Sequence, residues 1–80
     1  MEFRKAEQSG MTLTEWRKQN GLSLEALAAK LEKSKGHLHA VEKDGYATPR
    51  LALDIEALTN GEVDAGSLNA EIAEARKAAA

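Results

Sequence analysis

Apolar residues recur along the chain at the spacing of one helix face, in short stretches that turn residues separate. One stripe runs from residue 24 to residue 31. A second begins just after Ser34, whose hydroxyl suits a helix N-cap, and continues through Leu38 and Val41. Only Glu32 and Lys33 remain between the two stripes, so residues 24–31 and 34–43 are predicted to be two short helices joined by a tight turn.

Local signals place further helices on both sides of this pair. Before it, the Thr12-Leu13-Thr14-Glu15 run forms a capping box, and Gly21 ends the helix that follows. After it, Thr48 and Pro49 suit the N-cap and the first position of a fourth helix. Two short helices joined this tightly and packed among others are the arrangement of a helix-turn-helix.

Residues 62–80 form a C-terminal helical segment. Asp64 and Gly66-Ser67 suggest a short turn of helix, and either Ser67 or Asn69 is able to cap a last helix. Val63 and Leu68 are expected to anchor the segment on the preceding bundle. The last helix carries a thin apolar stripe of Leu68, Ile72, Ala75 and Ala79. So thin a stripe does not hold an isolated helix, so the helix must dock on its own bundle or on a second copy.

Composition favours one small all-α domain. The chain has 80 residues and only three aromatic side chains, Phe3, Trp16 and Tyr46, so its core must be mostly aliphatic. We expect a compact bundle of about five helices with three parts: residues 1–11 as a flexible N-terminal arm, residues 12–61 as the helix-turn-helix domain, and residues 62–80 as the segment above. Ser9-Gly10 interrupts any helix in the arm, whose alternative role is to bring Arg4 and Lys5 to phosphate or to the minor groove.

The charge is unevenly distributed. The net charge is −2, but residues 30–50 hold five basic and three acidic side chains, whereas residues 51–80 hold two basic and six acidic ones. Phosphate binding responds to the local field, so the basic excess over the helix-turn-helix outweighs the sign of the whole chain. The chain has no cysteine, no apolar run of membrane-span length and no signal-peptide core, which predicts a cytoplasmic protein.

The run from Leu22 to Gly45 resembles the Cro and phage-repressor helix-turn-helix family, and the similarity extends over about residues 12–60. In that family the second helix of the pair lies in the DNA major groove, and the proteins usually repress transcription as dimers. The resemblance therefore implies a lambda-repressor-like fold and a homodimer that binds a palindromic operator in double-stranded DNA. The matching residues are Gly21-Leu22-Ser23, Leu27-Ala28, Leu31, Ser34, Leu38, Val41 and Glu42.

The resemblance also predicts a structural ion pair. In the family a basic residue at the position of Arg17 often pairs with the glutamate that corresponds to Glu42. We therefore expect Arg17 and Glu42 to join the first helix to the end of the third. Self-association is expected to use Leu68, Ile72 and Ala75, since a dimer needs a contact outside the DNA-binding helix.

Residues near the N-terminal end of the second helix are the ones that reach base edges. Lys35 is able to donate to guanine, and Gly36 permits a close approach of the backbone. The spacing of His37 and His39 places them on different faces, so at most one reads a base. Residues expected to contact phosphate, which fix the register, are Ser23, Lys33, Ser34, Lys43, Tyr46 and Arg50. For Tyr46, plain packing is the alternative.

Two positions depart from the family pattern. Glu32 stands where the family commonly has a glycine in the left-handed conformation, which places an acid near the DNA face. Leu24 stands where a polar residue often touches DNA. Glu32, the acidic C-terminal half and the low total charge favour an alternative function, a protein-interaction module such as an antitoxin or an anti-regulator.

Other chemistries find little support. His37 and His39, two positions apart on one helix, cannot chelate a metal together, and no cysteine supports them. No nucleophile–base–acid set and no glycine-rich phosphate loop is present. We expect neither a metal, nor a cofactor, nor an enzyme activity.

Overall fold

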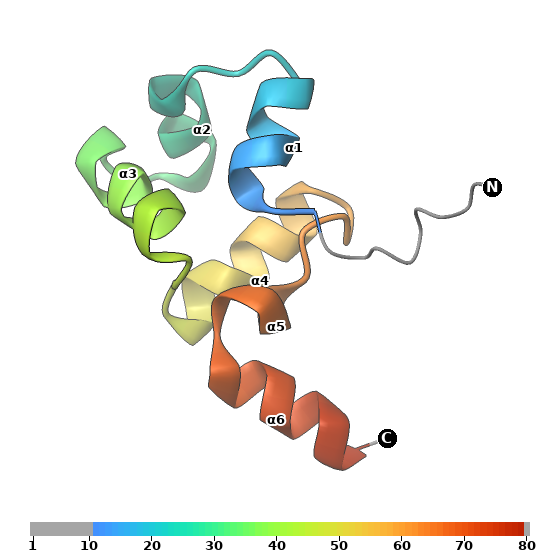
Figure 1. The fold of residues 1–80 in the computed structure, drawn as a ribbon. Helices are drawn as coiled ribbons and strands as arrows, with labels where there is room; N and C mark the ends of the chain where they lie inside the picture. The colour runs from blue at the N-terminus through green and yellow to red at the C-terminus, as the bar shows by residue number, and fades with distance from the viewer. Residues whose placement is uncertain (1–10, 80) are drawn as a thin grey trace, which may run out of the picture.

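The computed structural model describes residues 11–79, and these form a bundle of six helices without a strand among them. The bundle measures 35 × 31 × 19 Å along its principal axes. In Figure 1, α1–α4 enclose the core, α5 packs beneath α4, and α6 extends away from the body. The helices are α1 (Leu13–Gln19), α2 (Leu24–Leu31), α3 (Lys35–Asp44), α4 (Pro49–Leu58), α5 (Ala65–Leu68) and α6 (Ala70–Ala79).

The predicted all-α, helix-turn-helix fold is confirmed, with one helix more than expected. The sixth is α5, the four-residue turn of helix that Gly66-Ser67 suggested. The predicted caps of α1, α3 and α4 are present. The Thr12 and Glu15 side chains form the capping box of α1, and Ser34 and Thr48 each accept a backbone N–H at the start of α3 and α4; Ser23, expected above as a phosphate contact, caps α2 in the same way. The N-terminal arm, with Arg4 and Lys5, lies outside the described residues.

The core is aliphatic apart from Trp16, as the composition requires. Every helix from α1 to α5 contributes at least one buried side chain, and the α3–α4 loop adds Ala47. The largest fully buried apolar side chains are Leu27, Leu38, Leu51, Ile55 and Val63. Burial of this apolar surface is the main force that holds the helices together.

Asn69 fixes the junction between α5 and α6. Its side chain is 3% exposed, and its Nδ2 donates to the Ala47 carbonyl at 2.9 Å. Its Oδ1 accepts the backbone N–H groups of Glu71 and Ile72, so Asn69, and not Ser67, caps the last helix. The buried amide of Asn69 therefore has hydrogen-bond partners for both its nitrogen and its oxygen, and the same side chain caps α6. The junction thereby joins α6 to the loop that leads out of α3.

α6 meets the body through Ile72, which belongs to the predicted apolar stripe, and through an ion-pair cluster that the stripe did not predict. No residue of α6 is buried. The side of α6 that meets the body carries Ile72, which is half-buried against the core, and Arg76, which pairs with Glu56 and Asp64. Ala75 lies to one side and is exposed.

The expected self-association surface is correspondingly smaller. Leu68 is 6% exposed and belongs to the chain's own core, as its predicted anchoring role requires. Because it is buried there, Leu68 is not available for contact with a second copy. Of the three residues assigned to self-association, Ala75 is exposed and Ile72 is half-buried.

Candidate nucleic-acid interface

The turn between α2 and α3 is built by residues 32–34. Glu32 ends α2 with φ 59° and ψ 41°, the left-handed conformation that the sequence pattern assigns to this position. The backbone N–H of Lys33 donates to the Ala28 carbonyl at 2.9 Å, which closes the end of α2 as a glycine-type cap does. Ser34 then accepts the His37 N–H at 3.1 Å and starts α3. The turn is therefore short and fixed at both ends.

The inner face of α3 is held by apolar contacts and one ion pair. Leu38 and Val41 are buried. The Arg17 Nε donates to Glu42 Oε2 at 2.7 Å and its Nη2 donates to Oε1 at 3.1 Å, which is the pair that the resemblance predicts. This hydrogen bonding raises the pKa of the Arg17 guanidinium. Because both Glu42 oxygens are occupied by Arg17, this acid is turned away from the outer face and its charge is matched.

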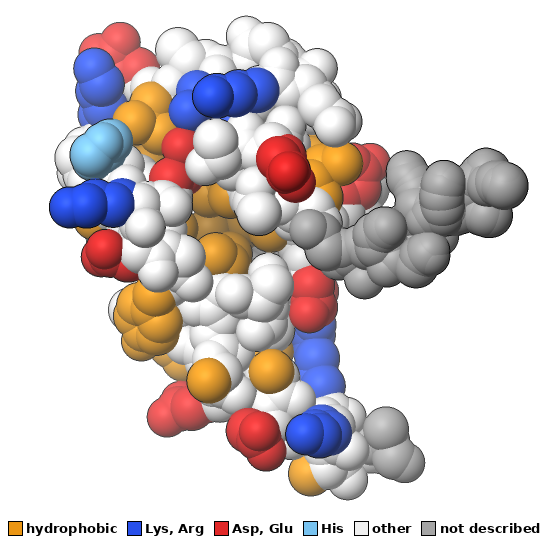
Figure 2. Space-filling view, viewed as in Figure 1, with side chains coloured by type: hydrophobic (Ala, Val, Ile, Leu, Met, Phe, Trp, Pro, Cys, Tyr) orange, Lys and Arg blue, Asp and Glu red, His pale blue; other side chains and the backbone are white. Residues whose placement is uncertain are grey.

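The outer face of α3 carries lysine and histidine side chains around the exposed Gly36. Lys35, His39 and Lys43 are spaced four residues apart and form one row, whereas His37 lies on the other side of the helix. Gly36 is exposed, and a Cβ built there meets no atom within 4 Å. Figure 2 shows Lys and His side chains gathered along the edge of the molecule that α3 forms, with acidic side chains at its two ends.

The residues expected to contact phosphate lie on the elements around α3. Ser23 and Ser34 use their hydroxyl oxygens as N-caps, which leaves each O–H free to donate. The Arg50 side chain is 87% exposed, and its only ion pair within residues 11–79 is a loose one, 3.7 Å from Nε to Asp54 Oδ1. Tyr46 is 55% exposed, so it lies outside the core and its hydroxyl is accessible from solvent.

The starts of α3 and α4 are positively charged without compensation. An acidic residue lies in the first turn of α1, α2 and α6, but none lies in the first turn of α3 or α4. Lys35 and Arg50 stand there instead, at helix ends that already carry partial positive charge. A cation in the first turn costs helix stability, so this arrangement favours an anion outside the helix.

All ten residues named from the sequence for DNA contact are exposed, and they belong to consecutive elements from the start of α2 to the start of α4. Three exposed acids interrupt this surface: Glu25 in the first turn of α2, Glu32 in the turn, and Asp44 at the end of α3. Within residues 11–79, no three His, Cys, Asp or Glu side chains gather as a metal site would require. No helix in the same range is long and apolar enough to span a membrane.

Sequence reasoning missed two features outside this surface. One is the cluster of Arg76 with Glu56 and Asp64, which joins α6 to α4 and to the start of α5. The other is a groove between α2 and α4. The signal for it was Leu53, an apolar residue that lies off the buried stripe of α4 and is 44% exposed.

A comparison with protein-family models matches residues 13–64 to a family described as helix-turn-helix. The matched range covers well over half of the chain, from the start of α1 to the residue before α5. Neither the curated proteins nor the solved structures contain a match to this chain. The last two helices therefore lie outside the part that the family shares.

Proposed function

The chain belongs to the Cro/repressor-like helix-turn-helix family of DNA-binding regulators, and on this premise we propose that it represses transcription in the cytoplasm as a homodimer. In this proposal each copy inserts α3 into the major groove at one half of a palindromic operator. Lys35, Gly36 and one of the two histidines, His37 or His39, meet the bases.

The observation that carries the proposal is the group of exposed basic side chains around two helix N-termini that have no acid in their first turn. The first turns of α3 and α4 lack an acid, and the exposed Lys35, Lys43 and Arg50 surround them. Lysines on a helix surface are ordinarily just solvated. Here they coincide with two helix N-termini whose partial charge also attracts phosphate. His39 shares the row of Lys35 and Lys43, so it is the better candidate to read a base.

Pairing of two copies is assigned to α6. Its accessible strip, Ile72 and Ala75, is small compared with the interface of a stable dimer, which buries about 1,200–2,000 Å². We therefore expect weak association of the free protein and firm association on DNA, where two half-sites hold both copies close together. Asn69 supports this role, because it fixes α6 to the loop after α3 and so sets the spacing of the two α3 helices.

Selection of bound sequences from random duplex DNA, at two salt concentrations, tests the proposal. The expected result is a palindromic site whose half-sites lie about one helical turn apart, with affinity that falls steeply with salt. Absence of binding at low salt, together with co-purification of a protein partner, would establish the interaction module instead. The exposed acids Glu32 and Asp44 are the observation that favours this second function.

Two lysine variants separate the proposed roles. Lys35→Ala is expected to relax sequence preference, with a loss of about 1–3 kcal/mol on the selected site. Lys43→Ala is expected to weaken binding to all sequences alike and to reduce the salt slope by about 1. Lys18→Ala, at the exposed end of α1, is the matched control and is expected to change neither property.

A further inference from the structure

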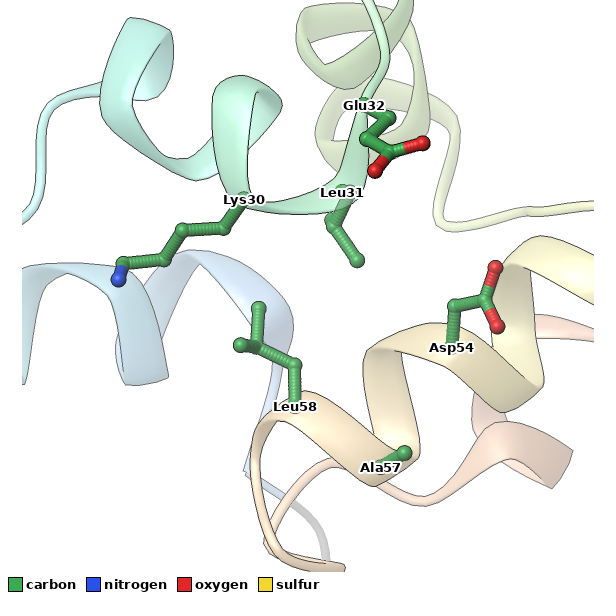
Figure 3. A pocket seen from close by; sticks show the side chains of 6 residues that line it. All are labelled: Lys30, Leu31, Glu32, Asp54, Ala57 and Leu58. Carbon is green, nitrogen blue, oxygen red and sulfur yellow. The ribbon is translucent and has the colours of Figure 1, made fainter.

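A groove of about 460 Å³ lies between the end of α2 and the second half of α4. Its middle is apolar, with Leu31 from α2 facing Leu58 from α4 (Figure 3). Lys30 stands at one end, whereas Glu32 and Asp54 stand together at the other. The groove therefore has a fixed polarity: positive, then apolar, then doubly negative.

Within residues 11–79 nothing fills this groove or matches its acidic end. Glu32 has no ion-pair partner in that range, and Asp54 has only the loose contact of 3.7 Å with the exposed Arg50. Leu53, one turn before Ala57 on α4, does not line the groove but is a second exposed apolar side chain near it, 44% exposed. An apolar surface with unmatched charge beside it is typical of a docking site.

One segment of the chain has the complementary order of side chains. Residues 2–5 read Glu-Phe-Arg-Lys: an acid, an aromatic ring and two cations. We propose that this segment docks in the groove of its own chain, with Phe3 on Leu31 and Leu58. Arg4 and Lys5 then lie beside the acidic end, and Glu2 lies beside Lys30.

The chain is long enough for this contact. Phe3 lies eight residues before Met11, the first described residue. An extended chain covers at most about 3.3–3.6 Å per residue, which gives a reach of about 26–29 Å. The bundle itself measures 35 × 31 × 19 Å, so this reach is comparable to the dimensions of the body.

A second cavity is a poorer match for the same segment. It has a volume of about 150 Å³, and its lining includes Met11, Val41 and Leu68. Its only acid is Glu42, which already pairs with Arg17. This cavity offers room for an apolar side chain but nothing for Arg4 and Lys5, so charge complementarity selects the larger groove.

Docking would also change the candidate nucleic-acid interface. Glu32 directly precedes Lys33 and Ser34, so two cations held beside it offset the acid that interrupts the basic surface. This consequence rests on the proposed function, whereas the docking itself does not. The experiment therefore contains no DNA, so its failure is distinct from a failure to bind DNA.

A spin label at position 6 tests the docking in the full chain. Because the chain has no cysteine, Ala6→Cys gives one attachment point, next to the docked segment but not in it. Paramagnetic broadening of amide NMR signals is expected at Lys30, Leu31, Ala57 and Leu58. Signals of the last turn of α6 serve as the reference and keep their intensity.

Paired substitutions define the outcomes. Phe3→Ser is expected to restore the broadened signals, and Phe3→Leu to leave them broadened. Arg4→Glu with Lys5→Glu is expected to abolish the broadening, and adding Glu32→Lys with Asp54→Lys to recover it. Broadening that is absent, or that centres on Val41 and Leu68, overturns the proposal. So does broadening seen only in a mixture of spin-labelled and isotope-labelled chains, since a second copy then supplies the segment.

Discussion

Two arginines, Arg17 and Arg76, each join helices that are distant in the sequence, but they lie in different surroundings. The Arg17 and Glu42 side chains are 16% and 10% exposed, and they join α1 and α3, two helices that both bury apolar side chains in the core. The Arg76 and Glu56 side chains are 47% and 24% exposed, and Arg76 lies on α6, a helix that buries no residue of its own. The body is thus held by apolar burial with a shielded ion pair, whereas α6 depends on exposed charges and on Asn69.

Because of this difference, salt and pH are expected to affect the packing of α6 more than the folding of the body. Exposed ion pairs are screened by salt, and partly buried ones much less. Conditions that leave the body folded are therefore expected to alter the docking of α6. Because self-association is assigned to α6, the pairing of two copies would respond to those conditions before the helix-turn-helix does.

The largest effect is expected in the core of the body. Leu38→Ala removes a fully buried side chain from α3 and leaves a cavity, at a cost of about 2–5 kcal/mol. That is a large part of the stability of an ordinary domain, about 5–15 kcal/mol. Urea denaturation measures the loss. Ile72→Ala, half-buried on α6, is the matched control, and an equal loss there would show that α6 belongs to the core after all.

A smaller loss is expected when the shielded ion pair is broken. Arg17→Met removes both hydrogen bonds to Glu42 and leaves that carboxylate poorly solvated, which costs about 2 kcal/mol. The double variant Arg17→Met, Glu42→Leu is expected to recover most of the loss, because no charge is then left unmatched. A double variant no more stable than the single one would show that Arg17 acts through its bond to the Leu22 carbonyl instead.

The local signals in the sequence predicted the helices and the anchors Val63 and Leu68, but not how α6 packs on the body, for a physical reason. A cap such as Ser34 acts within three residues, so its partner is known once the helix is known. The packing of α6 depends on Asn69 meeting Ala47, and on Arg76 meeting Glu56. These contacts join residues about twenty positions apart, and no periodicity reports them.

In the candidate interface, too, local spacing predicted some features, whereas features that depend on distant residues were not predicted from spacing. Exposure of Lys35 and Lys43 follows from helix spacing alone, since Leu38 and Val41 fix the opposite face. The Arg17–Glu42 pair was predicted only through the resemblance to a family. The groove between α2 and α4 was not predicted at all, because its two walls come from separate parts of the chain.

A gain in stability is expected at the turn of the helix-turn-helix. Glu32 holds a φ of 59°, where a side chain costs up to about 1 kcal/mol relative to glycine. Glu32→Gly is therefore expected to raise the melting temperature without changing the fold. Glu32→Gln keeps the Cβ and should leave the melting temperature near that of the parent. If both variants gain alike, the charge of Glu32, and not its backbone conformation, is the unfavourable feature.

The smallest effect on global stability, and the most local one, is expected from acid at α6. Hydrogen bonds from Arg76 lower the pKa of Glu56 from 4.5 to about 2. A carboxyl whose pKa is lowered by folding contributes stability that is complete above the unfolded pKa and is lost as the pH falls through the folded one. Between about pH 4.5 and pH 2, faster amide hydrogen exchange is therefore expected in α6, with the core amides of Leu38 and Ile55 as reference. Arg76→Met should give fast exchange in α6 at neutral pH and remove most of the dependence on acid. If α6 in that variant exchanges as slowly as in the parent, Ile72 and Asn69 alone hold the helix, and the contrast between the two arginines does not extend to stability.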